Sequence, residues 1–220
     1  GIKGFTVQPT YAWKMGSKWS AAVGLDINCV QLTLKAAAPL SAAPQIDAFT
    51  NVDGTSYGLG GMLSLMYDFD KNTSAALVYR TQIKHDMDAD TDISSILPVA
   101  NFSTTAHGSV TLPDSFEFGL GHKFNDGKTR VEFDAIWTNW TTYDALDLSF
   151  DTNSLGLTSK NSRKDWKSAW RFNLGIEHKL SDQWSILGGY AYDQSPVPDD
   201  TMDFTVPTGD RHRLSCGLKY

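Results

Sequence analysis

The residues that could do chemistry in this chain are few, and the most regular group of them is acidic. Asp86, Asp88, Asp90 and Asp92 stand at every second position, so a strand would point all four carboxylates to one side. Such a row could bind divalent ions, or it could simply be a solvated strand end. The segment 68–72 begins like a calcium-binding loop but lacks the required glycine and closing glutamate. We therefore predict no metal site.

Residues for acid–base or nucleophilic catalysis are equally sparse. The five histidines are scattered, and the chain has neither a Gly-x-Ser-x-Gly elbow nor a glycine loop for phosphate. A hydrolase would have to use His85 beside Asp86, or His107 with a nearby serine. Cys29 and Cys216 form no short-spaced zinc or redox motif, and they either form a long-range disulfide or remain separate thiols. We predict no catalytic residues and no cofactor, with a hydrolase as a minor alternative.

The composition narrows the class of protein. The formal net charge is −6, which argues against nucleic-acid binding because that function uses clustered Lys and Arg. No run of about 18 apolar residues occurs, so a membrane-spanning helix is excluded. Aromatic residues make up 12% of the chain and include seven Trp and eight Tyr, as is usual in barrels with aromatic girdles at the membrane interfaces. The residues after Gly1 do not form a signal peptide, so we expect a mature sequence or a part of a longer one.

Apolar and polar side chains alternate over long segments. In the segment 166–180, Trp170 and Phe172 would lie on one face of a strand, with Arg171 and Asn173 on the other. Segments of about ten residues or more have the length needed to cross a bilayer at a tilt. The same pattern recurs in eight further segments, at 5–15, 18–34, 56–69, 74–84, 115–124, 130–140, 184–192 and 211–220.

Short and long connections alternate between these segments. The short ones contain turn-forming residues and lie at 16–17, 70–72, 125–128 and 181–183. The long ones span roughly 36–55, 87–108, 150–165 and 195–209. Tight periplasmic turns and long extracellular loops are typical of outer-membrane barrels. We therefore predict an all-β fold, a transmembrane antiparallel up-and-down β-barrel with about nine strands in one domain over residues 1–220; a soluble β-protein that binds sugar is the minor alternative.

Several motifs, in order along the chain, carry a family resemblance. They are Gln8-Pro9 with Lys18-Trp19-Ser20, the segments 67–72 and 79–81, the segments 112–117 and 166–171, and the segment 192–199 with Pro207 and residues 210–215. Together they resemble the FadL family of long-chain fatty acid transporters in the bacterial outer membrane. Barrels of that family have fourteen strands and an N-terminal hatch in the lumen. By this resemblance the chain covers about nine of those strands and lacks the hatch and the terminal strands, and His212 departs from the aromatic residue that is usual there.

The resemblance implies passive uptake of hydrophobic molecules, most simply long-chain fatty acids. In the family, ligand enters a groove between two extracellular loops, passes into the lumen and leaves through a gap in the wall. The corresponding loops here are 36–55 and 87–108. Exposed apolar side chains in such loops indicate a binding groove, or else a lid in which the loops pack on each other. The apolar candidates for the ligand site are Leu40, Ile46, Phe49, Ile93, Ile96, Leu97, Val99 and Phe102.

A fatty acid carboxylate would need a cation beside the apolar groove. Lys35, Lys167 and Arg171 are the candidates. An aromatic hydrocarbon would need no cation, so uptake of aromatic hydrocarbons stays open as the alternative. We expect a monomeric barrel whose partners are the apolar ligand, outer-membrane lipid and lipopolysaccharide.

Overall fold

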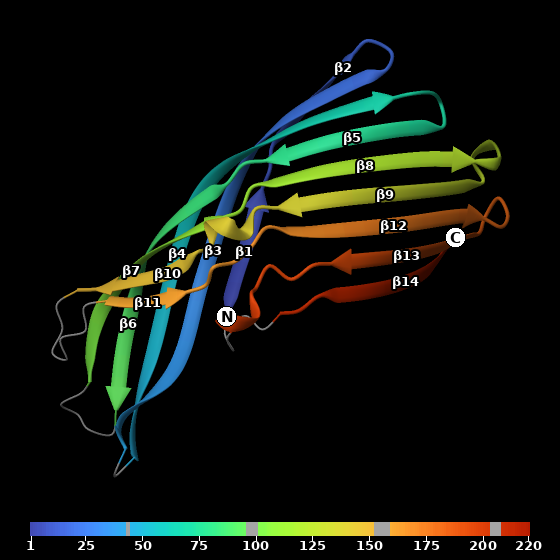
Figure 1. The fold of residues 1–220 in the computed structure, drawn as a ribbon. Coiled ribbons are helices and arrows are strands. Elements are labelled where there is room, and N and C mark those ends of the chain that lie inside the picture. Colours follow the sequence, from blue (N-terminus) through green and yellow to red (C-terminus); the bar gives the residue numbers. More distant parts are fainter. Residues whose placement is uncertain (43–44, 96–100, 152–158, 203–207) are drawn as a thin grey trace.

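The computed structural model describes residues 1–42, 45–95, 101–151, 159–202 and 208–220, and these residues are mostly β-structure. Fourteen strands of this described part form one antiparallel sheet (Figure 1). The strands are β1 (Ile2–Val7), β2 (Thr10–Met15), β3 (Trp19–Ala42), β4 (Gln45–Asp68), β5 (Thr73–Arg80), β6 (Ile83–Ser95), β7 (Phe102–Leu112), β8 (Ser115–Phe124), β9 (Thr129–Thr138), β10 (Ala145–Phe150), β11 (Ser159–Arg163), β12 (Ala169–Lys179), β13 (Ser185–Asp193) and β14 (Arg211–Lys219). None of the described helices, all of them single 3₁₀ turns, is long and apolar enough to span a membrane.

The predicted membrane strands are confirmed. They form a wall in the order β2, β3, β4, β5, β8, β9, β12, β13, β14, joined by the predicted short turns. The first predicted strand, 5–15, is divided into β1 and β2, which both pair with β3. The division falls at Gln8–Pro9, because proline has no N–H to donate to the ladder. Cys29 on β3 and Cys216 on β14 are free thiols.

The prediction that residues 36–55 form a loop was wrong. β3 and β4 each run for 24 residues and stay paired from Trp19 opposite Tyr67 to Ala42 opposite Gln45. The predicted loop 87–108 is likewise largely the hairpin of β6 and β7, and β6 pairs with the far half of β4. Part of 150–165 forms β11, which pairs with β10. The backbone groups of these segments are therefore paired in strand ladders and do not depend on water for their hydrogen bonds.

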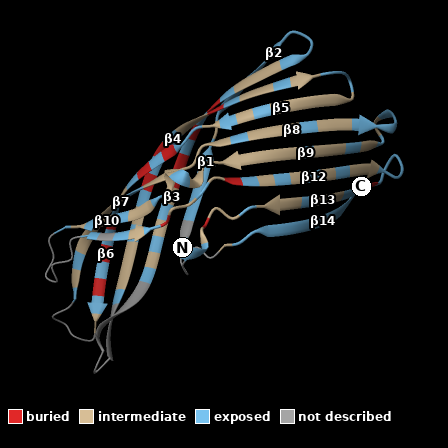
Figure 2. Cartoon of the chain, in the orientation of Figure 1, coloured by how far each residue is buried: buried red, intermediate tan, exposed pale blue. Residues whose placement is uncertain are grey.

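The sheet divides into two parts. β5 leaves β4 after the pair Met62–Arg80, and β6 joins β4 again from the pair Gly54–Ala89 onward. The strands β6, β7, β10 and β11 with the far halves of β3 and β4 form what we call the extension, which is inclined to the wall (Figure 1). Many of the buried residues gather where β3, β4 and β6 enter the extension (Figure 2). Among the described strands, β14 pairs only with β13, β11 pairs only with β10, and β1 and β2 pair only with β3, so the sheet has free edges at both ends of the wall and at β11 in the extension.

Candidate functional site

One face of the wall is apolar and exposed. On β3 the side chains of Val23, Leu25 and Ile27 are 40% to 48% exposed. At the end with the short turns, the rings of Trp19 and Tyr67 lie 4.5 Å apart by their centroids and begin an aromatic girdle. Large apolar side chains that face outward over a whole sheet need a lipid surface rather than water.

The opposite face of the wall is polar and charged. Asp26 is 4% exposed and accepts a hydrogen bond of 2.6 Å from Gln8 Nε2. Arg80 and Glu117 form an ion pair of 2.7 Å between β5 and β8. Pairing of opposite charges lets this face line a barrel lumen.

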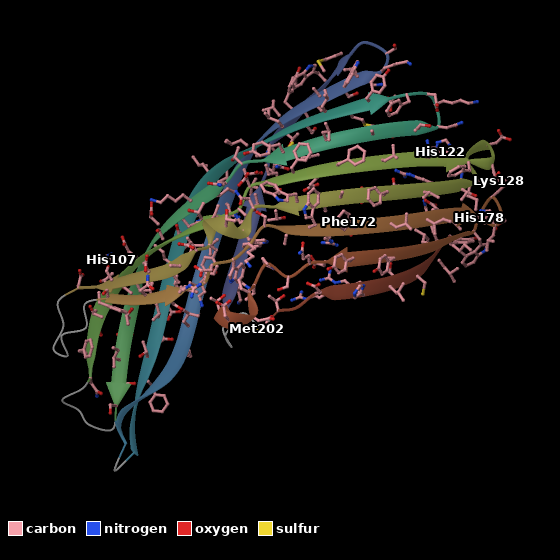
Figure 3. All side chains as sticks on the ribbon, viewed as in Figure 1. His107, His122, Lys128, Phe172, His178 and Met202 are labelled. Carbon is pink, nitrogen blue, oxygen red and sulfur yellow. The ribbon has the colours of Figure 1, made fainter. Side chains whose placement is uncertain are left out.

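The two faces exchange character at one level of the sheet. Cys29 on β3 pairs with Tyr57 on β4, and this is the last row on the lipid side that carries an apolar or aromatic pair before polar residues begin. Two residues further along, the same face carries Gln31 opposite Thr55, with Lys3 of β1 beside Gln31. The hydrocarbon layer therefore ends near the Cys29–Tyr57 pair, and the extension lies outside the membrane at the end away from the short turns. Figure 3 labels residues from both ends of the molecule, including His107 in the extension.

Beyond that level the inner face becomes apolar. Val30, Leu32 and Leu34 continue along β3 on the side that carries Asp26 and Asn28 in the wall. With residues of β4, β6, β7 and β10 they enclose a pocket of about 170 Å³. The full lining is Val30, Leu32, Leu34, Val52, His85, Met87, Ala89, Ala106, Gly108, Ser109, Val110, Leu112, Leu146 and Leu148.

His85 is the histidine of this pocket, and it is only 2% exposed. Its Nδ1 lies 3.3 Å from Ser56 Oγ, and that hydroxyl donates a hydrogen bond of 2.8 Å to the backbone oxygen of Asp86. The Asp86 carboxylate instead pairs with Lys84, on the exposed face. Within the described residues His85 Nε2 has no hydrogen-bond partner, so Ser56 and His85 lack the acid of a hydrolytic triad.

A second pocket of about 560 Å³ lies where the lumen meets the extension. Arg171 and Arg211 contribute two cations, and Trp140 and Trp166 contribute aromatic rings whose centroids are 5.1 Å apart. Arg171 Nε donates to Asn173 Oδ1 at 3.1 Å. Among the described residues Arg171 has no carboxylate partner, because Glu117 pairs with Arg80 and Asp193 with Arg213. This pocket can therefore accept an anion.

A third recess of about 350 Å³ shares lining residues with both pockets. It shares Leu112 with the apolar pocket, and Pro113 and Ser115 with the pocket of Arg171. The three recesses therefore lie next to one another around the residues that join β7 to β8.

The structure separates the predicted cations. Arg171 lines the lumen pocket. Lys35 is exposed on the polar outer face of the extension, in line with Gln31 and Thr33. Lys167 is exposed, and its backbone N–H donates to Pro196 O at 2.8 Å. Arg211, Trp140 and Trp166 were not predicted as site residues, because they come from segments that only the strand order brings together.

The predicted apolar residues also fall on different faces. Ile93 is 8% exposed on the inner face and stands opposite the half-buried Phe102. Phe49 is 59% exposed on the outer face. Leu40 belongs to β3 and Ile46 to β4, but the side chains of these two residues are not among those that the structure describes. Ile96, Leu97 and Val99 also lie outside the described residues.

The acidic row lies on the outer face of β6, as its alternation predicts. Asp86, Asp88, Asp90 and Asp92 are all exposed, and the described part of the chain contains no group of acidic, histidine or cysteine residues able to hold a metal ion. His107 Nδ1 lies 2.7 Å from Asp88, and its Nε2 lies 3.2 Å from Asp151. These hydrogen bonds, first that with Asp88, raise the pKa of His107.

An antiparallel wall with a lipid-facing apolar side and a charged lumen side defines a transmembrane β-barrel of the bacterial outer membrane. The chain belongs to the family described as "Outer membrane protein transport protein (OMPP1/FadL/TodX)", whose model matches residues 1–220.

Known relatives agree with this membership. The chain is 28% identical over 194 residues to the long-chain fatty acid transport protein of Escherichia coli O157:H7. The aligned region covers 82% of this chain and 43% of the relative. A Pseudomonas aeruginosa FadL homologue has a similar structure, with a TM-score of 0.82 and 19% identity over 99% of this chain and 55% of its own. The CymD monoaromatic hydrocarbon channel gives a TM-score of 0.72 and 18% identity over 99% of this chain and 64% of its own. The chain spans about half the length of the curated relatives it matches.

Proposed function

We propose that this chain forms part of a single barrel domain that takes up hydrophobic small molecules passively, with long-chain fatty acids as the ligands. The observation that carries the proposal is the apolar inner face of the extension. Residues such as Leu32, Met87 and Leu148 enclose an apolar pocket outside the membrane, where burial of a hydrocarbon chain is favourable by about 0.8 kcal/mol per CH₂ group. The printed names of the relatives, a fatty acid transport protein and a hydrocarbon channel, support the same class of ligand.

The pocket of Arg171 favours fatty acids over aromatic hydrocarbons. Its guanidinium lacks a carboxylate partner among the described residues, and a ligand carboxylate would supply one with a charge-assisted bond. In this proposal the alkyl chain is captured in the apolar pocket of the extension, and the carboxylate is bound by Arg171. Ile93 and Phe102 belong to the apolar inner face near the capture pocket. Lys35 and Phe49 lie on the outer surface of the extension and do not line that pocket.

Uptake of radiolabelled oleate tests the proposal, with the full-length protein in cells that lack their own fatty acid transporter. We expect uptake by the wild type and a loss of about tenfold in Arg171→Ala. Arg130→Ala, a lumen residue outside the two pockets of this path, is the matched control and should keep normal uptake. Uptake of toluene but not of oleate would instead favour the aromatic hydrocarbon alternative.

A further inference from the structure

Two histidines on the lipid side of the wall are held in the same way at the end with the short turns. His122 Nδ1, near the end of β8, lies 2.8 Å from Thr73 Oγ1. His178 Nδ1, near the end of β12, lies 2.8 Å from Thr129 Oγ1. Each threonine is the first residue of its strand after a short turn, and each histidine follows its threonine by 49 residues. The same arrangement therefore occurs twice along one rim of the sheet (Figure 3).

The two rings lie at the edge of the hydrocarbon layer. Leu120 is a lipid-facing residue of β8, 40% exposed, and His122 is the next residue on the same face. Tyr67 of the aromatic girdle pairs with Ala75, which pairs with Leu120. His122 thus lies two residues beyond the girdle row, and His178 stands next to the last residue of β12. At this level the outer face of a barrel meets lipid head groups.

The hydrogen bonds leave one ring nitrogen of each histidine for a ligand. Asn125 Nδ2 donates to Thr129 Oγ1 at 3.4 Å, so the Thr129 hydroxyl gives its own hydrogen to His178 Nδ1, and Nε2 carries the proton of the neutral ring. The Thr73 hydroxyl lies closer to His122, at 2.8 Å, than to a carboxylate oxygen of its own turn, at 3.3 Å. Among the described residues neither Nε2 has a hydrogen-bond partner, and both atoms are accessible.

Lysines without an ion-pair partner lie in the same turns. Lys71 is in the turn before β5, Lys128 is in the turn before β9, and Lys179 follows the second histidine. Their side chains are exposed and form no ion pair within the described part of the chain. Asp70 of the first turn accepts instead from two backbone N–H groups of that turn. Ammonium and imidazole N–H groups together are complementary to a phosphate.

We propose that the two Thr–His pairs are binding sites for the phosphate of membrane phospholipids in the leaflet on the side of the short turns. Each Nε2–H donates to a phosphate oxygen, and the neighbouring lysine adds a charge-assisted contact. The acyl chains lie along apolar side chains deeper in the membrane, such as Leu120 and Ile176. The threonines fix the rings before the lipid arrives, so binding loses little side-chain freedom. These sites lie apart from the pockets of the proposed function and do not depend on it.

Native mass spectrometry of the purified full-length protein in detergent, titrated with dimyristoyl phosphatidylglycerol, tests the proposal. His122→Phe and His178→Phe keep an aromatic ring at the rim and remove the N–H donor. We expect each variant to lower the affinity for one lipid about tenfold, and the double variant to lower both, because a hydrogen bond to a charged group is lost. Thr129→Val, which keeps the side-chain shape but no longer holds the ring, should weaken one site by a smaller factor.

His107→Phe is the matched control, because His107 belongs to the extension, outside the membrane, and should keep both lipids. Dimyristoyl glycerol has the same chains without the phosphate, and the wild type should bind it about tenfold more weakly. Equal affinity of the wild type for the two lipids, or unchanged phosphatidylglycerol affinity in the folded double variant, would overturn the proposal. Displacement of the bound lipid by millimolar inorganic phosphate would also overturn it, since the sites would then bind free anions.

Discussion

Arginine scanning along β4 would locate the membrane boundary directly. Leu63 faces lipid, is 61% exposed and stands opposite Val23, within the apolar band. Thr55 is exposed on the same face of the same strand, beyond the Cys29–Tyr57 pair. We expect Leu63→Arg to destabilise the folded barrel strongly and Thr55→Arg to leave its stability nearly unchanged.

The magnitude follows from the height of the apolar band. Trp19 and Cys29 are 10 residues apart, which at a rise of about 3.4 Å and a tilt of about 40° spans roughly 25 Å. Leu63 lies 4 residues from Tyr67 and 6 from Tyr57, close to the bilayer midplane. Arginine at the midplane costs about 2–4 kcal/mol and close to the interface about 0–1 kcal/mol.

Guanidinium unfolding in phospholipid vesicles, followed by tryptophan fluorescence of the full-length protein, measures these differences. Ser64→Arg is the matched control, since Ser64 is the neighbour of Leu63 on the lumen face and should tolerate the charge. Equal destabilisation by Leu63→Arg and Thr55→Arg would refute the boundary, as would a neutral effect of Leu63→Arg.

Three further outcomes are expected. The pKa of His107 is raised, so the protonated side chain stabilises the pairing of β10 with β7. This stabilisation is complete below the ordinary pKa of histidine. It is lost as the pH rises through the raised pKa. Amide hydrogen exchange in β10 should therefore speed up over that range beyond its intrinsic pH dependence, and the extra change should be absent in His107→Gln. Leu148→Trp should fill the apolar pocket and lower oleate uptake about tenfold or more, whereas Ser149→Trp, on the exposed face, should not. Gly16→Ala should lower the unfolding free energy by about 1 kcal/mol because Gly16 has φ +89°, whereas Gly175→Ala, which has open space and no positive φ, should lower it less in denaturant unfolding.

The sequence predicts the wall well because lipid imposes a strict period of two. Segments such as 115–124 carry that period over their full length and become β8 with the same bounds. The turns are equally predictable, since residues such as Gly16 and Asn125 tolerate the positive φ values found there. Both signals are local, so no knowledge of strand order is required.

The extension was missed because its alternation has the opposite sense. Lys35 and Phe49 were predicted as a cation beside, and an apolar residue within, the expected loop 36–55, and both lie on the outer face. To predict which face these residues occupy, the alternation of odd and even positions along β3 would have to be continued beyond Cys29. The pocket of Arg171 and Arg211 could not be predicted in this way, because it depends on the register between strands far apart in the sequence.

The exchange of faces near the Cys29–Tyr57 pair also protects the β3–β4 hairpin against misalignment. A slip by one residue turns every side chain to the other face. In this hairpin such a slip would bring Asp26 into hydrocarbon and Leu32 into water at the same time. Contact with lipid in one half of the hairpin and with water in the other therefore both favour the same register. Insertions into the far half should accordingly be tolerated in pairs of residues and rejected singly.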